Sequence, residues 1–460
     1  MSKVKIIATI GPSSANLIKE IVLAGASGLR VNFSHADQKE WAKYVRAVRK
    51  AEGEVLRPIA LIGDLRGGSV RIGKLPGEIR FKFGDELKFK LKGSGDVESK
   101  TIPLPVKEFF EVVEVGDLIL MDDGNLIFEV DGLGEGEVRV KALTAGRLTS
   151  NKGVVIRGKE IPVPTISDRD LDCIKFAVKN DFDYIALSYV KSGEDIRLLR
   201  DILDEFGANE IGVMAKIESV GGVNHLSDVV RLSDAILVAR GDLGMQFPLE
   251  KVPLLQRKII DECLRMGKPV IVATQVLSSM IENPSPTRAE VTDVVNAISE
   301  GADAIMLTGE TAIGEHPLEA VKWLKRIIDA YDSKVMVSRP SLGVGDVKLS
   351  FAYSVVVLSE SLNAKLAVYT KMGRTALRIA RFRPATPFYA ASNNIKTLRK
   401  LAIVWGIKPL RVEAKDYHEG VDATYMKLIK LGELKTGEIA VLTYGILEEY
   451  EHTIKIVRVK

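Results

Sequence analysis

Short, continuously apolar runs recur along most of the chain, and each is followed by polar or glycine residues and then by a segment with helical periodicity. Strands of a parallel sheet that is covered on both faces show this continuous apolar character, whereas half-exposed strands alternate. Eight such strand–helix units favour an α/β fold of the (β/α)8 barrel type over an open doubly wound sheet. The eight runs occupy residues 4–10, 28–33, 58–64, 183–189, 211–217, 234–240, 268–274 and 303–308.

Two stretches depart from this repeat. Residues 73–159 contain short alternating strands separated by Gly and Asp turns, which predicts a small all-β insert. An insert after a barrel strand lies above the C-terminal mouth, where it can act as a lid that excludes water. After the linker-like "SRPSLGVGD", helices and strands alternate again. We therefore expect a barrel at 1–72 and 160–335, a β lid at 73–159, and an α/β regulatory or assembly domain at 336–460.

Composition excludes several classes of protein. The 65 basic and 61 acidic residues leave a net charge of +4, which does not indicate a nucleic-acid-binding surface. No apolar run reaches the roughly 18–20 residues of a membrane span, and the apolar stretch at the N-terminus is too short for a secretory signal. The two cysteines lie in segments with helical periodicity, so we expect a cytoplasmic protein without a disulfide framework. The five histidines are not paired at ligand spacing, which argues against zinc and leaves hard, oxygen-bound ions.

Charged, amide and hydroxyl side chains follow nearly every predicted barrel strand, at the end where barrels carry their chemistry. Any one of them has an ordinary explanation, because polar residues end most strands. Their convergence on one mouth is what indicates a functional site. These residues are Arg30, Asn32, Ser34, Asp64, Arg66, Lys191, Lys216, Glu218, Arg240, Asp242, Thr274, Thr308 and Glu310.

Spacing at two strand ends sharpens this prediction. Residues two apart in an extended segment share a side, so Lys216 and Glu218 are expected to face the mouth together, as are Arg240 and Asp242. The carboxylates of Glu218 and Asp242 can then share one divalent cation with water and a substrate phosphate. A ring of salt bridges among these four residues is the alternative. Gly241 allows close approach to backbone N–H groups, which suits a carboxylate ligand.

Several motifs resemble those of pyruvate kinases, in the family's order: "ATIGPSS", "LRVNFSH", "MAKIES", "LVARGDLG", "GKPVIVATQ", "NPSPTRAE" and "GADAIMLTGETAIGEHPLEAV". The resemblance covers almost the whole barrel, the position of the β insert and the C-terminal α/β domain. It implies transfer of the phosphoryl group of phosphoenolpyruvate to ADP, which gives pyruvate and ATP. It also implies a Mg²⁺ or Mn²⁺ cofactor and a homotetramer.

The resemblance further implies a role for individual residues. Glu218 and Asp242 match the carboxylates that hold the divalent metal. Lys216 matches the lysine that neutralises the transferring phosphoryl group and the developing enolate. The K⁺ ligands of the family are matched by Asn32, Ser34, Asp64 and the Leu65 carbonyl. Its phosphate-binding arginines are matched by Arg30 and Arg71, and its nucleotide contacts by these arginines with Asn32, His35 and Lys152. The groups that bind the substrate carboxylate are matched by Gly241, Asp242 and Thr274, and the proton relay by Thr274, Thr308 and Glu310.

One departure from the family pattern concerns potassium. Where the family commonly reads "DTKGPEIR", this chain reads "DLRGGSVR". The Glu that often accompanies potassium dependence is Ser69 here, although the direct ligands match. The sequence therefore leaves K⁺ dependence undecided.

A second site is expected in the third domain, where "TKMGRTA" resembles the loop that holds a sugar-phosphate effector. Such a loop at a helix N-terminus can bind an anion, and the alternative is an ordinary helix cap with solvated charges. The family's Gly-rich closing loop is replaced by "YGILEEYEHTIKI", whose three Glu would repel a second phosphate. We expect an effector site for a smaller or different phosphorylated molecule, or none. The residues concerned are Thr370, Lys371, Gly373, Arg374 and Thr375.

Two other functions remain as alternatives to the kinase: a metal-dependent lyase or aldolase acting on pyruvate-like acids, and a non-catalytic metabolite sensor. Lys216, Arg30, Arg71 and the β insert suit a nucleotide, which a lyase would not need. A sensor would be expected to have lost Lys216 or a metal carboxylate, and neither is lost.

Overall fold

The computed structural model describes residues 2–332, 334–335, 337–342, 345–446 and 451–460. Among these residues, eight parallel strands close into a barrel in the spatial order β1-β16-β15-β14-β13-β12-β3-β2. Each strand arises from one of the eight apolar runs, so the predicted barrel is confirmed. The strands are β1 (Lys5–Ile10), β2 (Ala26–Asn32), β3 (Ala60–Asp64), β12 (Tyr184–Leu187), β13 (Gly212–Ile217), β14 (Ala235–Ala239), β15 (Val270–Ala273) and β16 (Ala304–Leu307).

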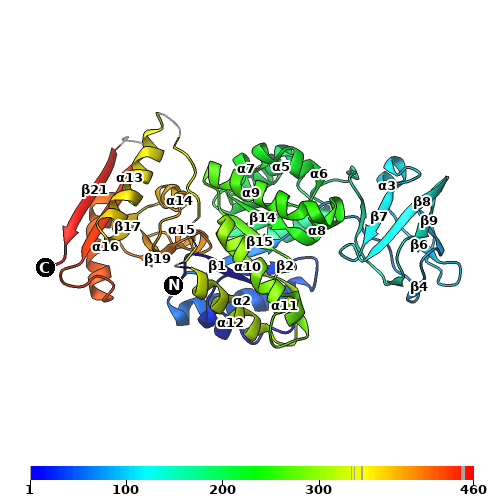
Figure 1. Cartoon of the computed structure of the whole chain (residues 1–460), viewed down its shortest axis with the longest axis horizontal. Helices are drawn as coiled ribbons and strands as arrows, with labels where there is room; N and C mark the ends of the chain where they lie inside the picture. Colours follow the sequence, from blue (N-terminus) through cyan, green and yellow to red (C-terminus); the bar gives the residue numbers. More distant parts are fainter. Residues whose placement is uncertain (1, 333, 336, 343–344, 447–450) are drawn as a thin grey trace.

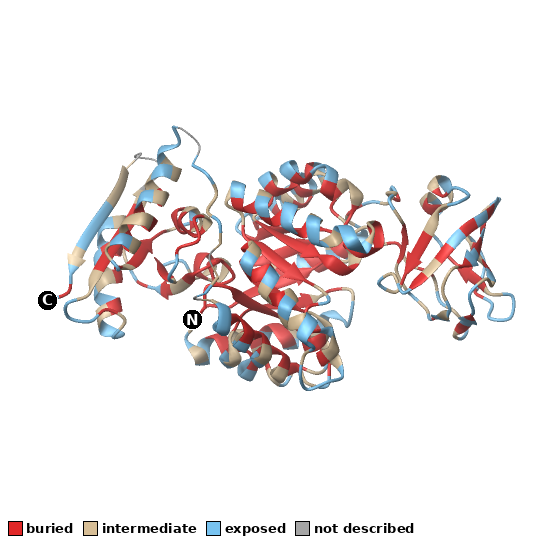
Figure 2. Ribbon diagram, viewed as in Figure 1, coloured by how far each residue is buried: buried red, intermediate tan, exposed pale blue. Residues whose placement is uncertain are grey.

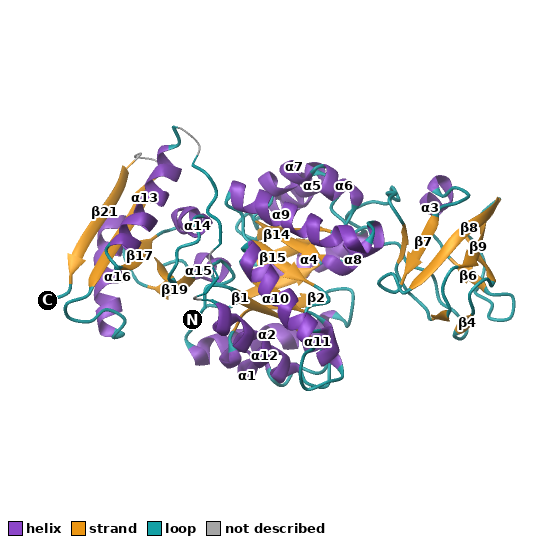
Figure 3. Ribbon diagram, viewed as in Figure 1, coloured by secondary structure: helices purple, strands orange, loops and turns teal. Residues whose placement is uncertain are grey.

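Helices surround the barrel (Figure 3). Three of them begin with a capping box, in which a Ser or Thr and an acidic residue three positions later satisfy each other's backbone N–H groups. The helical segments of this part of the chain are α1 (Ile18–Ala24), α2 (Gln38–Val55), α4 (Asp168–Lys179), α5 (Gly193–Glu205), α6 (Val220–Asn224), α7 (Leu226–Leu232), α8 (Arg240–Gln246), η1 (Leu249–Lys251), α9 (Val252–Met266), η2 (Ser278–Ile281), α10 (Arg288–Glu300), α11 (Gly309–Ala312) and α12 (Pro317–Tyr331).

The predicted β insert forms a separate body at one end of the molecule (Figure 1). It has a six-stranded sheet, β11-β7-β8-β9-β5-β6, a two-stranded sheet, β10-β4, and one short helix among its described residues. Its elements are β4 (Ile79–Phe81), β5 (Glu86–Lys90), β6 (Thr101–Pro103), α3 (Lys107–Val112), β7 (Leu118–Met121), β8 (Leu126–Gly134), β9 (Glu137–Ala142), β10 (Gly146–Leu148) and β11 (Val154–Ile156).

The C-terminal α/β unit lies at the opposite end of the molecule from the insert (Figure 1). Its sheet has the order β19-β18-β17-β20-β21, with the edge strand β21 antiparallel. The elements are α13 (Val347–Ser361), β17 (Lys365–Tyr369), α14 (Arg374–Arg381), β18 (Phe388–Ser392), α15 (Ile395–Leu401), β19 (Ile407–Arg411), α16 (Tyr417–Lys430), β20 (Ile439–Ile446) and β21 (Glu451–Arg458). The predicted domain boundaries stay predictions, and residue 336 lies outside the described residues.

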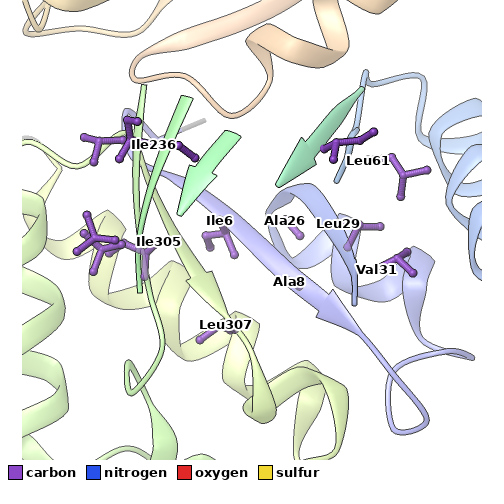
Figure 4. Close-up of a cluster of buried hydrophobic side chains, with 14 of the residues drawn as sticks. Ile6, Ala8, Ala26, Leu29, Val31, Leu61, Ile236, Ile305 and Leu307 are labelled. Carbon is purple, nitrogen blue, oxygen red and sulfur yellow. The ribbon is translucent and has the colours of Figure 1, made fainter. Parts of the chain in front are cut away.

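Burial is concentrated in the barrel strands (Figure 2). Successive residues of a strand point to opposite faces, so Ile7 packs inside the barrel with Met214 and Leu237, whereas Ile6 packs outside it. The outer layer joins strands to helices and includes Ile6, Ala8, Leu29, Ile236 and Ile305 (Figure 4). A packed barrel interior leaves the strand ends as the place for a cavity.

The insert contacts the barrel through a small apolar cluster. Leu120 of β7 and Val155 of β11 pack with Met245 of α8, and all three side chains are buried. Because α8 also carries Gly241 and Asp242, the insert rests directly on the helix that leads into the mouth.

Candidate active site

A cavity of about 660 Å³ opens at the C-terminal ends of the barrel strands. Its lining combines most of the residues that the sequence placed at the mouth. Six predicted residues are not part of the lining: Lys152, Lys191, Glu218, Arg240, Gly241 and Glu310. Glu218 and Gly241 lie beside residues that are, whereas Lys191 donates to the Ile161 and Val163 carbonyls at 3.2 and 2.8 Å. The predicted residues that line the cavity are Arg30, Asn32, Ser34, His35, Asp64, Leu65, Arg66, Arg71, Lys216, Asp242, Thr274 and Thr308.

Lys216 lies at the centre of a group of buried charges. Its Nζ donates to the Ser188 hydroxyl at 2.6 Å and lies 3.4 Å from Oε2 of Glu218 and 3.6 Å from Oδ1 of Asp64. Burial alone would lower the pKa of Lys216, but the carboxylates of Asp64, Glu218 and Asp242 outweigh it and raise that pKa. The lysine is therefore held in its protonated form, as a fixed positive charge facing the cavity.

Arg30 supplies a second cation. Its Nε donates to Oδ2 of Asp64 at 2.7 Å, and its Nη1 donates to the Thr9 hydroxyl at 3.0 Å. Although burial opposes the effect, Arg30 and Lys216 together lower the pKa of Asp64. Asp64 is thus an ionised carboxylate that fixes two cations at the cavity wall.

Glu218 is suited to be a metal ligand because one of its carboxylate oxygens accepts no hydrogen bond. The side chain is fully buried, Oε1 accepts the Tyr189 N–H at 2.7 Å, and Oε2 accepts no hydrogen bond. Burial raises the pKa of Glu218, and the Lys216 ammonium opposes that rise. Because a buried oxygen without a hydrogen bond is costly, a metal cation bound directly at Oε2, in addition to the Lys216 ammonium 3.4 Å away, would satisfy the atom and keep the carboxylate charged.

The donor set beside Glu218 is small. No group of three or more His, Cys, Asp or Glu side chains comes together to hold a metal anywhere in the described part of the chain. Asp242 lines the cavity next to Glu218, so two carboxylates are available. Mg²⁺ commonly takes one or two protein carboxylates and completes its shell with water and substrate oxygens, which this site fits.

The expected pairing of Arg240 with Asp242 is wrong. Residues 240–246 form helix α8, so the two side chains are not on an extended segment. Arg240 does not line the cavity: its Nη1 donates to Asp293 at 2.7 and 2.6 Å, and its Nη2 donates to the Thr274 carbonyl at 3.0 Å. This arrangement also removes Arg240 from the alternative ring of salt bridges, which therefore does not form.

Thr274 has a positive φ of 66° and meets the start of α8. Its hydroxyl oxygen accepts the Gly241 N–H at 2.8 Å, so that N–H is occupied rather than free. The hydroxyl hydrogen of Thr274 stays available to donate into the cavity.

Glu310 lies behind Thr308. It is 1% exposed, and its carboxylate accepts the backbone N–H groups of Thr308 at 2.8 Å and Leu277 at 3.0 Å. The structure thus brings Thr308 to the cavity and places Glu310 where it fixes the adjoining loops.

Two neighbouring residues, Ser188 and Tyr189, escaped the sequence interpretation because they end an apolar run. Ser188 bridges Lys216 and the Leu65 carbonyl, to which its hydroxyl donates at 2.9 Å. The Tyr189 hydroxyl donates to Oδ1 of Asp242 at 2.9 Å. Burial and the nearby Asp242 and Glu218 carboxylates raise the pKa of Tyr189 well above its ordinary value, so the phenol stays protonated.

The insert adds residues from above. Asp123, in the turn between β7 and β8, lines the cavity, and burial together with Asp242 raises its pKa. Lys152 forms an ion pair with Asp122, and Arg71 donates to the Asn151 carbonyl at 3.0 Å. Asp123 was also missed, and its only signal was the acidic turn "MDDGN".

The predicted effector residues gather between β17 and α14. Gly373, with φ 82°, precedes the helix, and its N–H donates to the Thr370 hydroxyl at 2.9 Å. Lys371 Nζ lies 4.9 Å from the centre of the Tyr417 ring. The altered closing segment includes residues 447–450, which lie outside the described residues.

Comparison with known proteins identifies the family. The sequence model "Pyruvate kinase, barrel domain" matches residues 1–321, and the model "Pyruvate kinase, alpha/beta domain" matches residues 350–460. The pyruvate kinase of Pyrobaculum aerophilum is 38% identical over 98% of this chain and 96% of its own, and that of Thermotoga maritima is 35% identical over the full length of both.

Solved structures agree with this match. The crystal structure of the Pyrobaculum aerophilum pyruvate kinase superposes with a TM-score of 0.88, at 37% identity over 99% of both chains. A pyruvate kinase from Cryptosporidium parvum superposes with a TM-score of 0.90, at 31% identity over 100% of this chain and 96% of that chain. The chain belongs to the pyruvate kinase family.

Proposed function

We propose that the cavity at the barrel mouth is where this chain carries out the family's reaction, the transfer of the phosphoryl group of phosphoenolpyruvate to ADP. The observation that supports it most is the protonated Lys216 beside the unsatisfied Oε2 of Glu218. A fixed cation beside a carboxylate that can hold a metal can neutralise the negative charge of a phosphoryl group during its transfer. The transition state is loose, so positioning and charge neutralisation matter more than covalent chemistry.

In the reaction, the bond between phosphorus and the enol oxygen breaks while phosphorus bonds to a β-phosphate oxygen of ADP. We assign to Lys216 and Arg30 the neutralisation of the negative charge that develops on the phosphoryl and enolate oxygens. Glu218 and Asp242 would hold Mg²⁺ or Mn²⁺, which supplies further Lewis-acid charge neutralisation when bound. The Thr274 hydroxyl and the Asp242 N–H would receive the substrate carboxylate, while the Gly241 N–H, which already donates to Thr274 at 2.8 Å, would hold that hydroxyl in place.

The enolate then takes a proton at its methylene carbon. Lys216 is a poor donor, because three carboxylates raise its pKa. We assign the proton to a water or hydroxyl relay through Thr274 or Thr308, both at the cavity wall. Glu310 acts in this proposal by holding Thr308.

The insert is assigned the role of a lid over the nucleotide. Arg71, His35 and Lys152 would contact the phosphates of the nucleotide, and Asn32 and Arg30 would contact the nucleotide from the barrel side. Lys152 is paired with Asp122 and would exchange that partner for a phosphate. Closure of the lid would keep water from the phosphoryl group.

A coupled assay of pyruvate formation tests the function. We expect pyruvate to appear only when phosphoenolpyruvate, ADP and a divalent metal are all present. A lyase or aldolase would release pyruvate without ADP, and a metabolite sensor would release none.

The predicted K⁺ ligands do not fit a bound potassium ion well. Asp64 is already paired with Arg30 and faces Lys216, the Leu65 carbonyl accepts the Ser188 hydroxyl, and Oδ1 of Asn32 accepts the Ser34 N–H at 3.0 Å. The Arg30 and Lys216 cations already neutralise the Asp64 carboxylate, which is one of the predicted K⁺ ligands. We propose no step that uses potassium.

Potassium dependence can be measured at fixed ionic strength. When tetramethylammonium replaces K⁺, we expect kcat to change by less than about threefold, because Arg30 and Lys216 already supply positive charge there. A tenfold or larger requirement for K⁺ would contradict this expectation.

We propose a phosphorylated effector at the loop before α14, supported by the helix N-terminus and its basic residues. Activity titrated with sugar phosphates, phosphoglycerate and AMP should respond to one of them, and Arg374→Ala should weaken that response about tenfold or more. Arg411→Ala, on β19 of the same domain, is the matched control. No response in the unaltered protein would refute the site.

We also propose a cytoplasmic homotetramer. Both cysteines are free and buried, and none of the described helices has the length and apolar character that a membrane crossing requires. Ile454 and Ile456 on edge strand β21 are 37% and 54% exposed, which suits a subunit contact. Sedimentation analysis would test the assembly.

A further inference from the structure

Tyr189 contacts both proposed metal carboxylates, although they come from different strand ends. Its backbone N–H donates to Oε1 of Glu218 at 2.7 Å, after β13, and its hydroxyl donates to Oδ1 of Asp242 at 2.9 Å, in α8. The side chain lines the cavity together with Asp242, and Glu218 lies beside Lys216 of the same lining.

The backbone of Tyr189 is in the left-handed region, with φ 54°. A side chain other than Gly adopts this conformation at a cost and keeps it only where the surroundings fix it. Both neighbours are fixed: the Ser188 hydroxyl binds Leu65 and Lys216, and the Val190 carbonyl accepts the Ser219 hydroxyl at 2.7 Å. Tyr189 is therefore a rigid donor to both acids.

Each carboxylate is left with one oxygen for a ligand. Oε2 of Glu218 accepts no hydrogen bond and lies 3.4 Å from the Lys216 ammonium, and no hydrogen bond from the described residues ends on Oδ2 of Asp242. With its other oxygen tied to Tyr189, each acid offers a single oxygen to a metal rather than two. Mg²⁺ requires near-octahedral geometry and single-oxygen ligands, whereas Ca²⁺ accepts bidentate carboxylates and more ligands.

We propose that Tyr189 is a positioning residue that restricts Glu218 and Asp242 to single-oxygen binding and so selects a small divalent cation over Ca²⁺. The inference rests on the proposed assignment of these two acids as metal ligands. A buried phenol needs some acceptor in any protein. Here the hydroxyl of Tyr189 donates to Asp242 and its backbone N–H donates to Glu218, and a role in packing alone would not require both hydrogen bonds.

The variant Tyr189→Phe tests the proposal, because it keeps the ring and the backbone N–H and removes only the hydroxyl. Binding of Mn²⁺ to the substrate-free protein is followed by the electron paramagnetic resonance of free Mn²⁺, and Mg²⁺ and Ca²⁺ are measured by competition. We expect about tenfold weaker binding of Mn²⁺ and Mg²⁺, as is common when an outer partner of a metal ligand is lost. Ca²⁺ should lose little, so the preference for Mg²⁺ over Ca²⁺ should fall by a similar factor.

Tyr184→Phe is the matched control, because this buried tyrosine of β12 donates its hydroxyl to the Lys400 carbonyl, away from the mouth. It should bind all three ions as the unaltered protein does. If Tyr189→Phe changes every affinity by less than twofold, or weakens all three ions equally, the proposal is wrong. If Tyr189→Phe is normal and only Tyr189→Leu fails, the ring and not the hydroxyl matters, which also overturns it.

Asp242→Asn separates this inference from the proposed function. If Asp242→Asn loses Mn²⁺ but Tyr189→Phe does not, the metal site stands and the role of Tyr189 falls. If Asp242→Asn binds Mn²⁺ normally, the metal assignment itself fails.

Discussion

Replacing Lys216 with Met should lower kcat on the order of 10³-fold or more while the apparent affinity for phosphoenolpyruvate changes little. Met has a similar length but no charge, so the variant removes the cation that lies 3.4 Å from Glu218 and faces the cavity. Loss of one preorganised electrostatic contact to a transition state commonly costs 10²–10³-fold, and here two developing charges would lose their partner. Steady-state kinetics with phosphoenolpyruvate and ADP measures the effect.

Lys268→Met is a suitable control, because Lys268 is half-buried and donates to the Ser233 carbonyl, but lies before β15, at the opposite end of the barrel from the mouth. It should keep near-normal turnover. Turnover of Lys216→Met within about threefold of the unaltered protein would refute the role of Lys216. A large rise in KM with unchanged kcat would mean that the lysine serves only to bind substrate.

Replacing Asp242 with Asn should remove divalent-metal binding, with Mn²⁺ affinity falling at least about 100-fold, since loss of even an outer partner commonly costs 10–100-fold. Turnover should fall with it. The change keeps size and shape but removes the one of the two proposed metal carboxylates that lines the cavity. Titration of the substrate-free protein with Mn²⁺ measures the loss without relying on activity.

Asp293→Asn provides the comparison for this experiment. Asp293 lies close by, paired with Arg240, but it does not line the cavity. Its loss should leave the Mn²⁺ affinity within about twofold. Equal affinities for Mn²⁺ in Asp242→Asn and the unaltered protein would show that the metal binds elsewhere.

The barrel could be predicted from the sequence because its signal is repeated. Each strand is a continuous apolar run, and eight of them at similar intervals leave few other folds. The same reasoning placed Lys216 and Glu218 together, since both stand at the end of an extended strand where a two-residue spacing has a fixed meaning. The prediction failed for Arg240 because the chain becomes helical at that residue, and the spacing rule no longer applies.

Tyr189, Asp123 and the occupied N–H of Gly241 could not be predicted in this way. The role of Tyr189 at the site depends on its left-handed backbone conformation and on its hydrogen bonds to two acidic residues that lie 29 and 53 positions later in the chain. Asp123 reaches the mouth only through the packing of the insert on α8, and Gly241 is bound by Thr274 from the next strand end. Such contacts between distant segments carry no local pattern.

The position of the metal is the most direct test of the whole account. Crystals grown with Mn²⁺ and an unreactive analogue of phosphoenolpyruvate can be examined by anomalous scattering at the manganese edge. We expect a peak within bonding distance of Oε2 of Glu218 and Oδ2 of Asp242, with the phosphoryl or carboxylate oxygens of the analogue lying beside the metal and Lys216. A peak at any other place, with these two carboxylates unbound, would contradict it.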